Sequence, residues 1–311
     1  MATIVLKIDV DTYRGSREGT PNLARLLTLH KANATFLFSL GPDHTGWALR
    51  RAFRPGFFQK VSRTSVVEHY GLKTLMYGVL LPAPDIGKTC AKQLRAVADG
   101  GFECGIHTWD HVVWQDNVRD QGSQWTKLQM QKSVQHFQSI FGAAAKTHGA
   151  AGWQMNPHAF AELDELGIMY SSDGRAKLNE DGSLTEPGIG PYRMAIGTTI
   201  TRCFQMPTTL PTLDELLGRT INGVEIDTNN IADHILNLTK QPRDHVFTLH
   251  AELEGQKLAP IFERLLLGWQ AQGYHCSSMA EYAQTIDAAS LPIRPLEWGE
   301  LPGRSGQLII T

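Results

Sequence analysis

The sequence of 311 residues predicts an α/β fold in which helices cover a parallel sheet. Short apolar runs alternate with helical patterns along most of the chain, and a closed or nearly closed β/α barrel is the favoured form. Hydrophobic residues make up 42% of the sequence, which suits one large domain or two small ones. In such barrels the chemistry lies at the carboxyl ends of the strands, so the functional side chains are expected there.

In the first half of the chain, the pattern predicts strands over 4–10, 34–40 and 102–107, and helices from Thr20, over 85–99 and over 121–141. Pro21 at the first helical position and Gly142 after the last residue of the long helix support these bounds. In the second half, it predicts strands over 168–171, 200–204, 246–250 and 274–277, and helices over 228–239 and 258–271 with a short one at the end.

Two segments stand apart from this pattern. The tail over 291–311 contains Pro and Gly and has weak periodicity, so we expect it to be extended and peripheral to a domain over 1–290. The second segment, 44–84, is a long insertion after the second strand, and no acidic residue occurs between Asp43 and Glu68. An ordinary solvated loop is one interpretation. The favoured one is a surface that faces an anionic membrane, formed by Trp47, Arg50, Arg51, Phe57 and Phe58.

Bulk composition excludes several classes of protein. The net charge of -2 gives no basic field for nucleic acid, so no nucleic-acid partner is expected. None of the four cysteines forms a C-x-x-C pair, which indicates reduced thiols rather than a zinc ribbon or a redox motif. The first strand begins without a signal-peptide pattern, and no run of 18 uncharged apolar residues occurs, so a cytoplasmic location is expected.

Asp9 and Asp11 end the first predicted strand. Residues two apart on a strand project to the same face, and burying two like charges there without a partner costs several kcal/mol per ion. A metal ion bound to one carboxylate would remove this cost and leave the other as a base. The alternative is a solvent-exposed strand end, which a D-x-D pattern by itself does not exclude.

His107 and His111 lie four residues apart in the run H-T-W-D-H. They are either unrelated surface histidines or two imidazoles that converge on one ion. Combined with one aspartate they would form a two-histidine, one-carboxylate site with open positions, which is typical of a catalytic metal centre. Zinc suits these ligand types best, and manganese, cobalt or iron are also compatible.

His250 ends the strand predicted over 246–250. Hydrolysis of an amide needs a base for the attacking water and an acid for the leaving nitrogen. Asp9 suits the first role and His250 the second, although a capping or core histidine is the alternative for His250.

The order of these motifs resembles the polysaccharide deacetylase family with its NodB homology domain, from the first strand to about residue 283. The matching runs are I-D-V-D, A-T-F-L-F, H-T-W-D-H, Y-S-S-D and L-H. The resemblance implies a distorted (β/α) barrel with Asp9 as base, His250 as acid and Asp173 orienting that acid. It also implies one divalent metal ion held by Asp11, His107 and His111.

One motif departs from the family pattern. The family's arginine and proline before Gly-Trp are absent from the run G-A-A-G-W, which ends at Trp153. Arg14 and Arg175 are the candidates for the missing cation beside Asp9. We assign both arginines, with Trp153 as an apolar wall, to substrate binding.

Within the family, the runs I-D-V-D-T-Y-R-G-S-R-E-G and T-L-H-A-E-L-E-G are similar to those of members that remove a formyl group. The implied substrate is 4-deoxy-4-formamido-L-arabinose linked to undecaprenyl phosphate, in lipid A modification and polymyxin resistance. The enzyme would then contact the cytoplasmic face of the inner membrane. The alternatives are an amidase for a soluble N-acyl sugar or small amide, and a non-catalytic carbohydrate-binding protein. A glycosidase ranks low because it would give the histidines no role.

Overall fold

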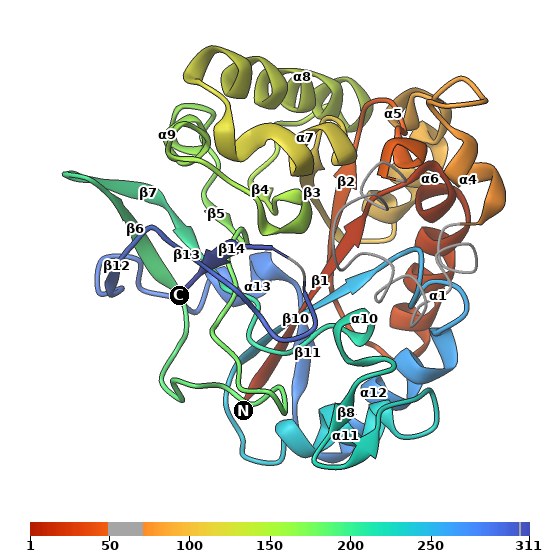
Figure 1. The fold of residues 1–311 in the computed structure, drawn as a ribbon, viewed down its shortest axis with the longest axis vertical. Helices are drawn as coiled ribbons and strands as arrows, with labels where there is room; N and C mark the ends of the chain where they lie inside the picture. Colours follow the sequence, from red (N-terminus) through yellow and green to blue (C-terminus); the bar gives the residue numbers. More distant parts are fainter. Residues whose placement is uncertain (49–70, 305) are drawn as a thin grey trace.

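The computed structural model describes residues 1–48, 71–304 and 306–311, so the expectations for Arg50, Arg51, Phe57 and Phe58 lie outside the described residues. Within the described part, a mostly parallel ten-stranded sheet forms the centre of the molecule (Figure 1). Its strands, in spatial order, are β10 (His245–His250), β1 (Thr3–Val10), β2 (Thr35–Ser39), β3 (Glu103–Thr108), β4 (Thr147–His148), β5 (Tyr170–Ser171), β7 (Thr199–Gln205), β6 (Tyr192–Ile196) and β12 (Ile293–Pro295), with β11 (His275–Ser277) beside β1. Two small antiparallel pairs are β8 (Thr220–Ile221) with β9 (Val224–Glu225), and β13 (Glu297–Gly299) with β14 (Leu308–Ile310).

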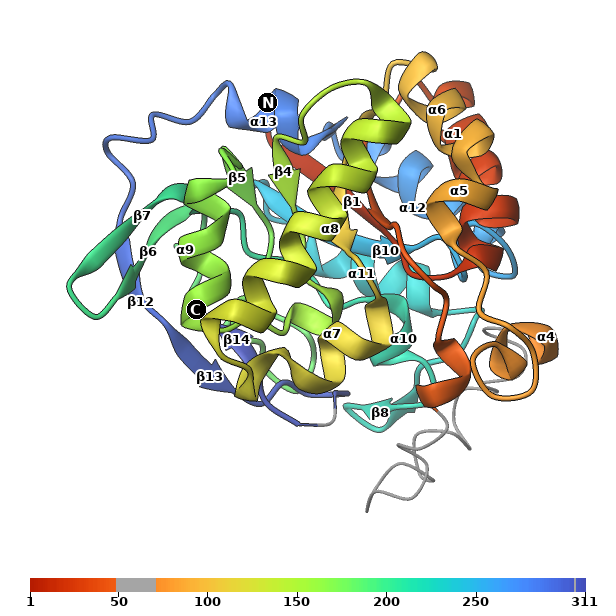
Figure 2. The ribbon, with the colours of Figure 1, turned by 90° about the horizontal axis from the view of Figure 1, so that it is seen from above.

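Helices surround this sheet. They are α1 (Thr20–Leu29), α4 (Leu72–Met76), α5 (Ile86–Thr89), α6 (Ala91–Asp99), α7 (His111–Asn117), α8 (Ser123–Phe141), α9 (Pro157–Glu165), α10 (Leu213–Leu216), α11 (Ile231–Leu238), α12 (Ala259–Ala271) and α13 (Met279–Ala283), with the π-helical turn η1 (Gly15–Gly19) and the 3₁₀ turns η3 (Val118–Asp120) and η4 (Ala151–Trp153). Figure 1 shows α8 and α9 on one side of the strands and α11 and α12 on the opposite side. Figure 2 shows α1, α5 and α6 together along one flank.

The sheet curves so that its later strands approach β10, the first strand in the spatial order. After β7 the chain passes beside β10, where the Thr209 amide donates to the Val246 carbonyl at 2.9 Å. The hydroxyl groups of Thr208 and Thr248 lie 2.7 Å apart at the same place. These contacts bring the two sides of the sheet together, in the manner of the distorted β/α barrel that the sequence predicts.

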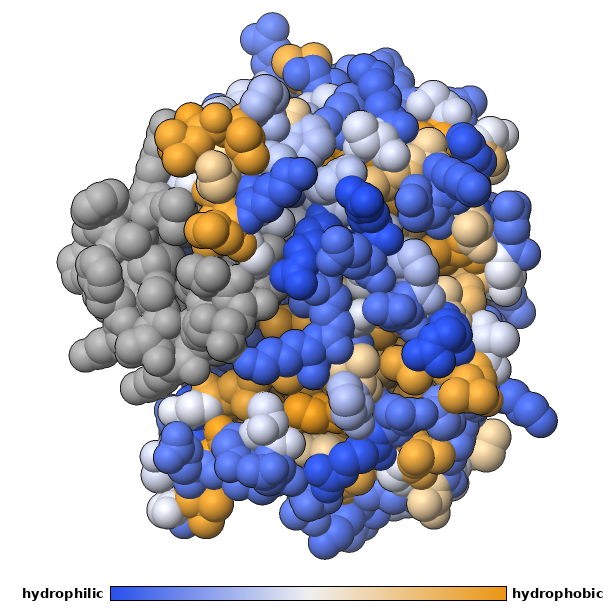
Figure 3. Space-filling model, turned by 90° about the vertical axis from the view of Figure 1, so that its right-hand side faces the viewer, coloured by the Kyte–Doolittle hydropathy of each residue, from blue (hydrophilic) through white to orange (hydrophobic). Residues whose placement is uncertain are grey.

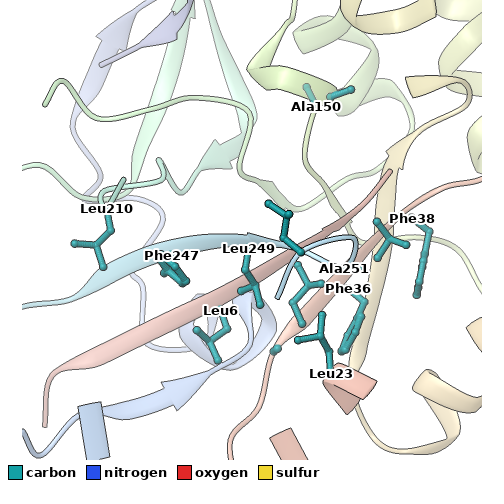
Figure 4. Packing of buried hydrophobic residues seen from close by; sticks show 14 of the residues in the cluster. Leu6, Leu23, Phe36, Phe38, Ala150, Leu210, Phe247, Leu249 and Ala251 are labelled. Atoms are coloured by element: carbon teal, nitrogen blue, oxygen red, sulfur yellow. The ribbon is translucent and has the colours of Figure 1, made fainter. Parts of the chain in front are cut away.

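The alternation of side chains along β1 separates two environments. Ile4, Leu6, Ile8 and Val10 belong to the main hydrophobic core, between the sheet and its helices. Figure 4 shows Leu6 with Leu249 of β10, Phe36 of β2 and Leu23 of α1. The alternate residues of β1, which include Lys7 and Asp9, therefore lie on the opposite face.

The register of β1 sets how far along the strands the functional residues lie. Asp9 pairs with His250 on β10 and with Leu37 on β2, so that these three residues lie on one level. Lys7 lies one step lower, opposite Thr248 and Thr35. The parallel strands end just beyond this level, so side chains from several strands meet there.

Most of the elements predicted from the sequence are confirmed, with local differences. The helix predicted over 85–99 is divided at Cys90 into α5 and α6. Helices α7 and α9 and the short strands β4 and β6 were not predicted, because their apolar runs are short. In the residues that the structure describes, no helix combines the length and apolar character needed to cross a bilayer.

The expectation of a peripheral tail is wrong for its last residues. β14 is buried. Two backbone hydrogen bonds join this part of the tail to Arg175: the Arg175 amide donates to the Ile309 carbonyl, and the Thr311 amide donates to the Arg175 carbonyl, each at 2.9 Å. The three apolar residues of this strand, Leu-Ile-Ile, are too few to show a periodicity that separates it from a loop.

This packing makes a prediction for stability. Ile309 is fully buried, so Ile309→Ala should lower the free energy of unfolding by about 2 to 5 kcal/mol, as for other large-to-small core substitutions. Ile293→Ala, in the same tail but at a side chain that is 53% exposed, should change it by less than about 0.5 kcal/mol. Chemical denaturation measures both, and equal effects would contradict the buried position of β14.

Candidate metal centre and catalytic groups

Asp11, His107 and His111 converge at the carboxyl ends of the strands. Asp11 follows β1, His107 lies near the end of β3, and His111 begins α7. The His107 Nε2 atom lies 3.2 Å from Asp11 Oδ1, and His111 Nε2 lies 3.4 Å from Asp11 Oδ2. Their potential ligand atoms all lie within 4.8 Å of one another. The structure thus brings together the three residues expected to bind a metal.

The protonation of His107 favours a cation at this place. His107 Nδ1 lies 2.6 Å from the Gly149 carbonyl, which can only accept, so Nδ1 carries a proton. In a neutral imidazole Nε2 then presents a lone pair to Asp11 Oδ1, which is buried and makes no hydrogen bond. These two lone-pair atoms repel each other unless a positive charge lies between them. One carboxylate and two imidazoles form a set of ligands that suits a divalent ion.

Glu252 fixes the backbone that carries Asp11. Its Oε1 atom accepts from the Asp11 amide at 3.1 Å, from the Thr12 amide at 2.8 Å and from the Thr12 hydroxyl at 2.8 Å. Gly15 leaves room for this carboxyl group, since a Cβ there would lie 1.9 Å from Oε1. Burial, followed by the nearby Asp11, raises the pKa of Glu252 to about 8. Sequence reasoning missed this residue, although its place two residues after His250 was a signal.

Asp9 lies beside this cluster and is almost completely buried. Its Oδ2 atom accepts from Lys7 Nζ at 3.1 Å. Its Oδ1 atom makes no hydrogen bond and lies 3.7 Å from His107 Nδ1. One oxygen of the carboxylate is therefore held by Lys7, and the other is buried without a hydrogen-bond partner.

The cation beside Asp9 is Lys7, and neither of the two expected arginines. Arg14 pairs with Glu18 at 3.2 Å on the surface. Arg175 is fully buried and binds Glu215 through both terminal nitrogens, at 2.5 and 2.9 Å. Residues two apart along a strand lie on the same face, so the spacing of Asp9 and Asp11 also places Lys7 on that face. This spacing was the signal in the sequence for Lys7.

Trp153 is 1% exposed and has a positive φ of 53°. Three cationic groups lie over its ring: Lys7 Nζ at 4.9 Å, the Arg175 guanidinium at 4.5 Å and the Arg304 guanidinium at 4.3 Å from the centre. Such contacts are attractive because of the ring quadrupole. The structure thus gives Trp153 an interior role, supporting cations, where the sequence suggested a wall for substrate.

The carboxylate beside His250 is Asp214, where Asp173 was expected. Asp173 accepts from His148 Nδ1 at 2.7 Å and from the Ala150 amide at 2.8 Å. Asp214 Oδ1 lies 4.0 Å from His250 Nδ1. Burial lowers the pKa of His250, but Asp214, followed by Asp11, raises it, and the net shift is upward.

The tail contributes to the same region. The Arg304 Nε atom donates to Glu215 Oε1 at 2.5 Å, and Arg304 Nη2 lies 4.0 Å from Asp214 Oδ2. Gly303, with a φ of 84°, allows the close approach, since a Cβ there would lie 2.4 Å from the Glu215 carbonyl oxygen. The sequence gave no signal for Arg304, because 88 residues separate it from Glu215 and only the fold joins them.

The two ends of the insertion are anchored near the metal cluster. His44 Nδ1 donates to Asp110 Oδ2 at 2.5 Å, directly before His111. Trp47 stacks on His44, with ring centres 3.9 Å apart, and its Nε1 donates to the Gly78 carbonyl at 2.7 Å. The insertion therefore begins at the rim of the site.

The structure thus combines a mostly parallel β/α fold with Asp9 and His250 on neighbouring strands and, beside them, a cluster that can hold a divalent ion. The sequence pattern of the family described as polysaccharide deacetylase matches residues 2–171. The chain belongs to the polysaccharide deacetylase family, and it is a hydrolase that acts on an amide C–N bond.

The chain is similar along most of its length to two curated proteins, each named as a 4-deoxy-4-formamido-L-arabinose-phosphoundecaprenol deformylase. The one from Shewanella sediminis is 32% identical over 97% of this chain and 92% of its own length. The one from Wigglesworthia glossinidia brevipalpis is 28% identical over 94% of this chain and 96% of its own length.

Solved structures share the fold. A protein of Mycobacterium smegmatis assigned as a polysaccharide deacetylase superposes with a TM-score of 0.62 at 14% identity, covering 97% of this chain and 96% of its own. A family 4 acetyl xylan esterase of Clostridium thermocellum, in complex with a cobalt ion, superposes with a TM-score of 0.51 at 12% identity, covering 94% and 97%.

The contact between Asp214 and His250 predicts a shift that NMR can measure. Asp214→Asn removes the largest influence that raises the pKa of His250, so the His250 imidazole should lose its proton at a lower pH. The control is Asp233→Asn, whose carboxylate pairs with Arg264 on the surface at 3.0 Å, and it should leave His250 unchanged. An unshifted His250 titration in Asp214→Asn would show that this aspartate does not act on it.

Proposed function

We propose that the protein is a metal-dependent deformylase that acts on 4-deoxy-4-formamido-L-arabinose linked to undecaprenyl phosphate. The observation that carries this proposal is that Asp9 and His250 are register partners on the neighbouring strands β1 and β10, beside the cluster of Asp11, His107 and His111. The two relatives named for this reaction match nearly the whole chain, which supports the formamido sugar as the substrate. The function belongs to lipid A modification with aminoarabinose and to polymyxin resistance.

Asp11, His107 and His111 would hold the divalent ion, with zinc the best match to these ligands and manganese, cobalt or iron as alternatives. When bound, the ion supplies Lewis acidity, which polarises an acyl carbonyl and makes water easier to deprotonate. Asp9 takes the proton of the attacking water through Oδ1, the oxygen that makes no hydrogen bond. His250 then donates a proton to the departing sugar nitrogen, and its raised pKa favours the protonated form that this step requires.

A lipid-linked substrate requires the site to approach a membrane, and we place the enzyme on the cytoplasmic face of the inner membrane. The sequence over 49–70 is rich in Arg, Lys and Phe. Directly after it, Leu72, Val79 and Leu80 are 66%, 56% and 74% exposed. They lie on and next to α4, on the side of the molecule that Figure 3 faces. A basic, aromatic segment followed in the sequence by exposed apolar side chains suits the headgroup zone of an anionic bilayer.

Formate release from the lipid-linked formamido sugar tests the reaction. A chelator should abolish it, and a divalent ion should restore it. Asp11→Ala and His107→Ala should lose bound metal, whereas Asp9→Asn should keep the metal and lose about 10²-fold or more in kcat, the usual range for a general base. His275→Ala, at an exposed histidine, is the control and should keep both metal and turnover. Full turnover in metal-free protein would rule out the proposed chemistry.

Sedimentation with anionic liposomes tests the membrane contact. Replacing Arg50, Arg51, Arg54, Lys60 and Arg63 with Gln removes up to about 1 kcal/mol of attraction each, so the variant should stay in the supernatant. The pair Leu72→Ser and Leu80→Ser should also weaken binding. The matched control is Leu128→Ser with Leu267→Ser, two side chains that are each 50% exposed on α8 and α12. Unchanged sedimentation of the basic variant would move the substrate assignment toward a soluble N-acyl sugar.

A further inference from the structure

We propose that Lys7 is a positioning residue that fixes the carboxylate of Asp9 for proton transfer. The inference rests on the proposed function in one respect, the use of Asp9 as the base. Lys7 Nζ lies 3.1 Å from Asp9 Oδ2, and both side chains come from the same face of β1. Lys7 thereby occupies, from two residues earlier on the strand, the place beside the base for which we expected Arg14 or Arg175.

Burial makes this contact strong and specific. The Lys7 side chain is 0% exposed and that of Asp9 is 4% exposed. Removing one member of a buried ion pair leaves an uncompensated charge, which is far more costly than losing a surface pair. The buried ion pair therefore restricts the Lys7 ammonium group to one favoured position, and it restricts the orientation of the Asp9 carboxylate in the same way.

The surroundings of Lys7 are shaped to let it reach Asp9. A Cβ on Gly149 would lie 2.7 Å from Lys7 Cε and 3.3 Å from Nζ, so only a glycine leaves space for the lysine in this conformation. Trp153 covers the ammonium group from another side, with its ring centre 4.9 Å away. The Gly149 carbonyl also accepts from His107. The run G-A-A-G-W thus accommodates the lysine and orients a metal ligand at the same time.

The geometry separates the two oxygens of Asp9 by role. Oδ2 is occupied by Lys7, while Oδ1 is buried, makes no hydrogen bond and lies 3.7 Å from Nδ1 of His107, one of the proposed metal ligands. A carboxylate free to rotate would exchange these oxygens and lose the alignment with an attacking water. Supporting contacts of this kind commonly change activity by 10- to 100-fold when they are removed.

The test compares Lys7→Met, Lys7→Arg and Asp9→Asn, alone and combined, in full-length protein saturated with zinc. Lys7→Met should keep the metal and KM but lose about 10- to 100-fold in kcat. Lys7→Arg, which retains the positive charge, should recover much of this loss. In the Asp9→Asn background, Lys7→Met should cause little further loss, because the carboxylate it positions is gone. Equal losses in both backgrounds, or full kcat in Lys7→Met, would overturn the proposal.

A matched control separates positioning from general stabilisation. Glu103 is a half-buried carboxyl near the opposite end of the sheet that accepts from Thr35, Tyr170 and the Ala280 amide. Glu103→Gln should destabilise the fold and leave kcat unchanged. Were Glu103→Gln to reduce kcat as much as Lys7→Met, the loss at Lys7 would reflect stability alone and the proposal would fail.

Two further readouts keep the result independent of the substrate. All variants are assayed on the lipid-linked formamido sugar and on an acetylated chitooligosaccharide. Wild-type activity on the second substrate alone would count against the proposed substrate and leave the test of Lys7 intact. Chemical unfolding of the same set should show that Lys7→Met and Asp9→Asn together destabilise less than the sum of the two. Additive destabilisation would overturn the link between them even if neither substrate is hydrolysed.

Discussion

The period of two along β1 is the constraint on which the rest of the site depends. One face of the strand carries Ile4, Leu6, Ile8 and Val10 into the hydrophobic core, which fixes the strand between the sheet and its helices. The opposite face then necessarily carries Lys7 and Asp9, and Asp11 follows at the strand end. Because a shift by one residue would place charges in the core and apolar groups in the site, the register of this strand is strongly specified.

Around β1, the site is assembled from contacts that each restrict one functional group. Glu252 holds the backbone of Asp11, Gly149 sets the tautomer of His107, and Lys7 occupies one oxygen of Asp9. Two carboxylate oxygens, Asp11 Oδ1 and Asp9 Oδ1, remain buried without a hydrogen bond, and the first faces His107 Nε2 at 3.2 Å. This division between held atoms and atoms without a hydrogen bond is the physical basis of preorganisation, since little rearrangement is then required when substrate arrives.

A second ionic network closes the other side of the site and joins distant parts of the chain. Glu215 binds both Arg175 and Arg304, and the two guanidinium groups lie over Trp153. Burial raises the pKa of Glu215, but Arg175 and then Arg304 outweigh it and lower that pKa to about 2. The adjacent Asp214 lies opposite His250. The tail is therefore part of the wall that surrounds the active site, and β14 anchors it through the backbone of Arg175.

The sequence by itself determined the parallel α/β fold through the alternation of apolar runs and helical patterns. Local spacing made Asp9 with Asp11, His107 with His111, and His250 candidates for the site, and the family resemblance added which of them would bind a metal. The sequence also contained Lys7, which the same spacing places beside Asp9. Only the tertiary structure decided that Asp214 and Arg304 face this region while Asp173 binds His148. The reason is that β10, α10 and the tail meet through contacts between residues far apart in the chain, and no local periodicity records which loop ends beside which strand.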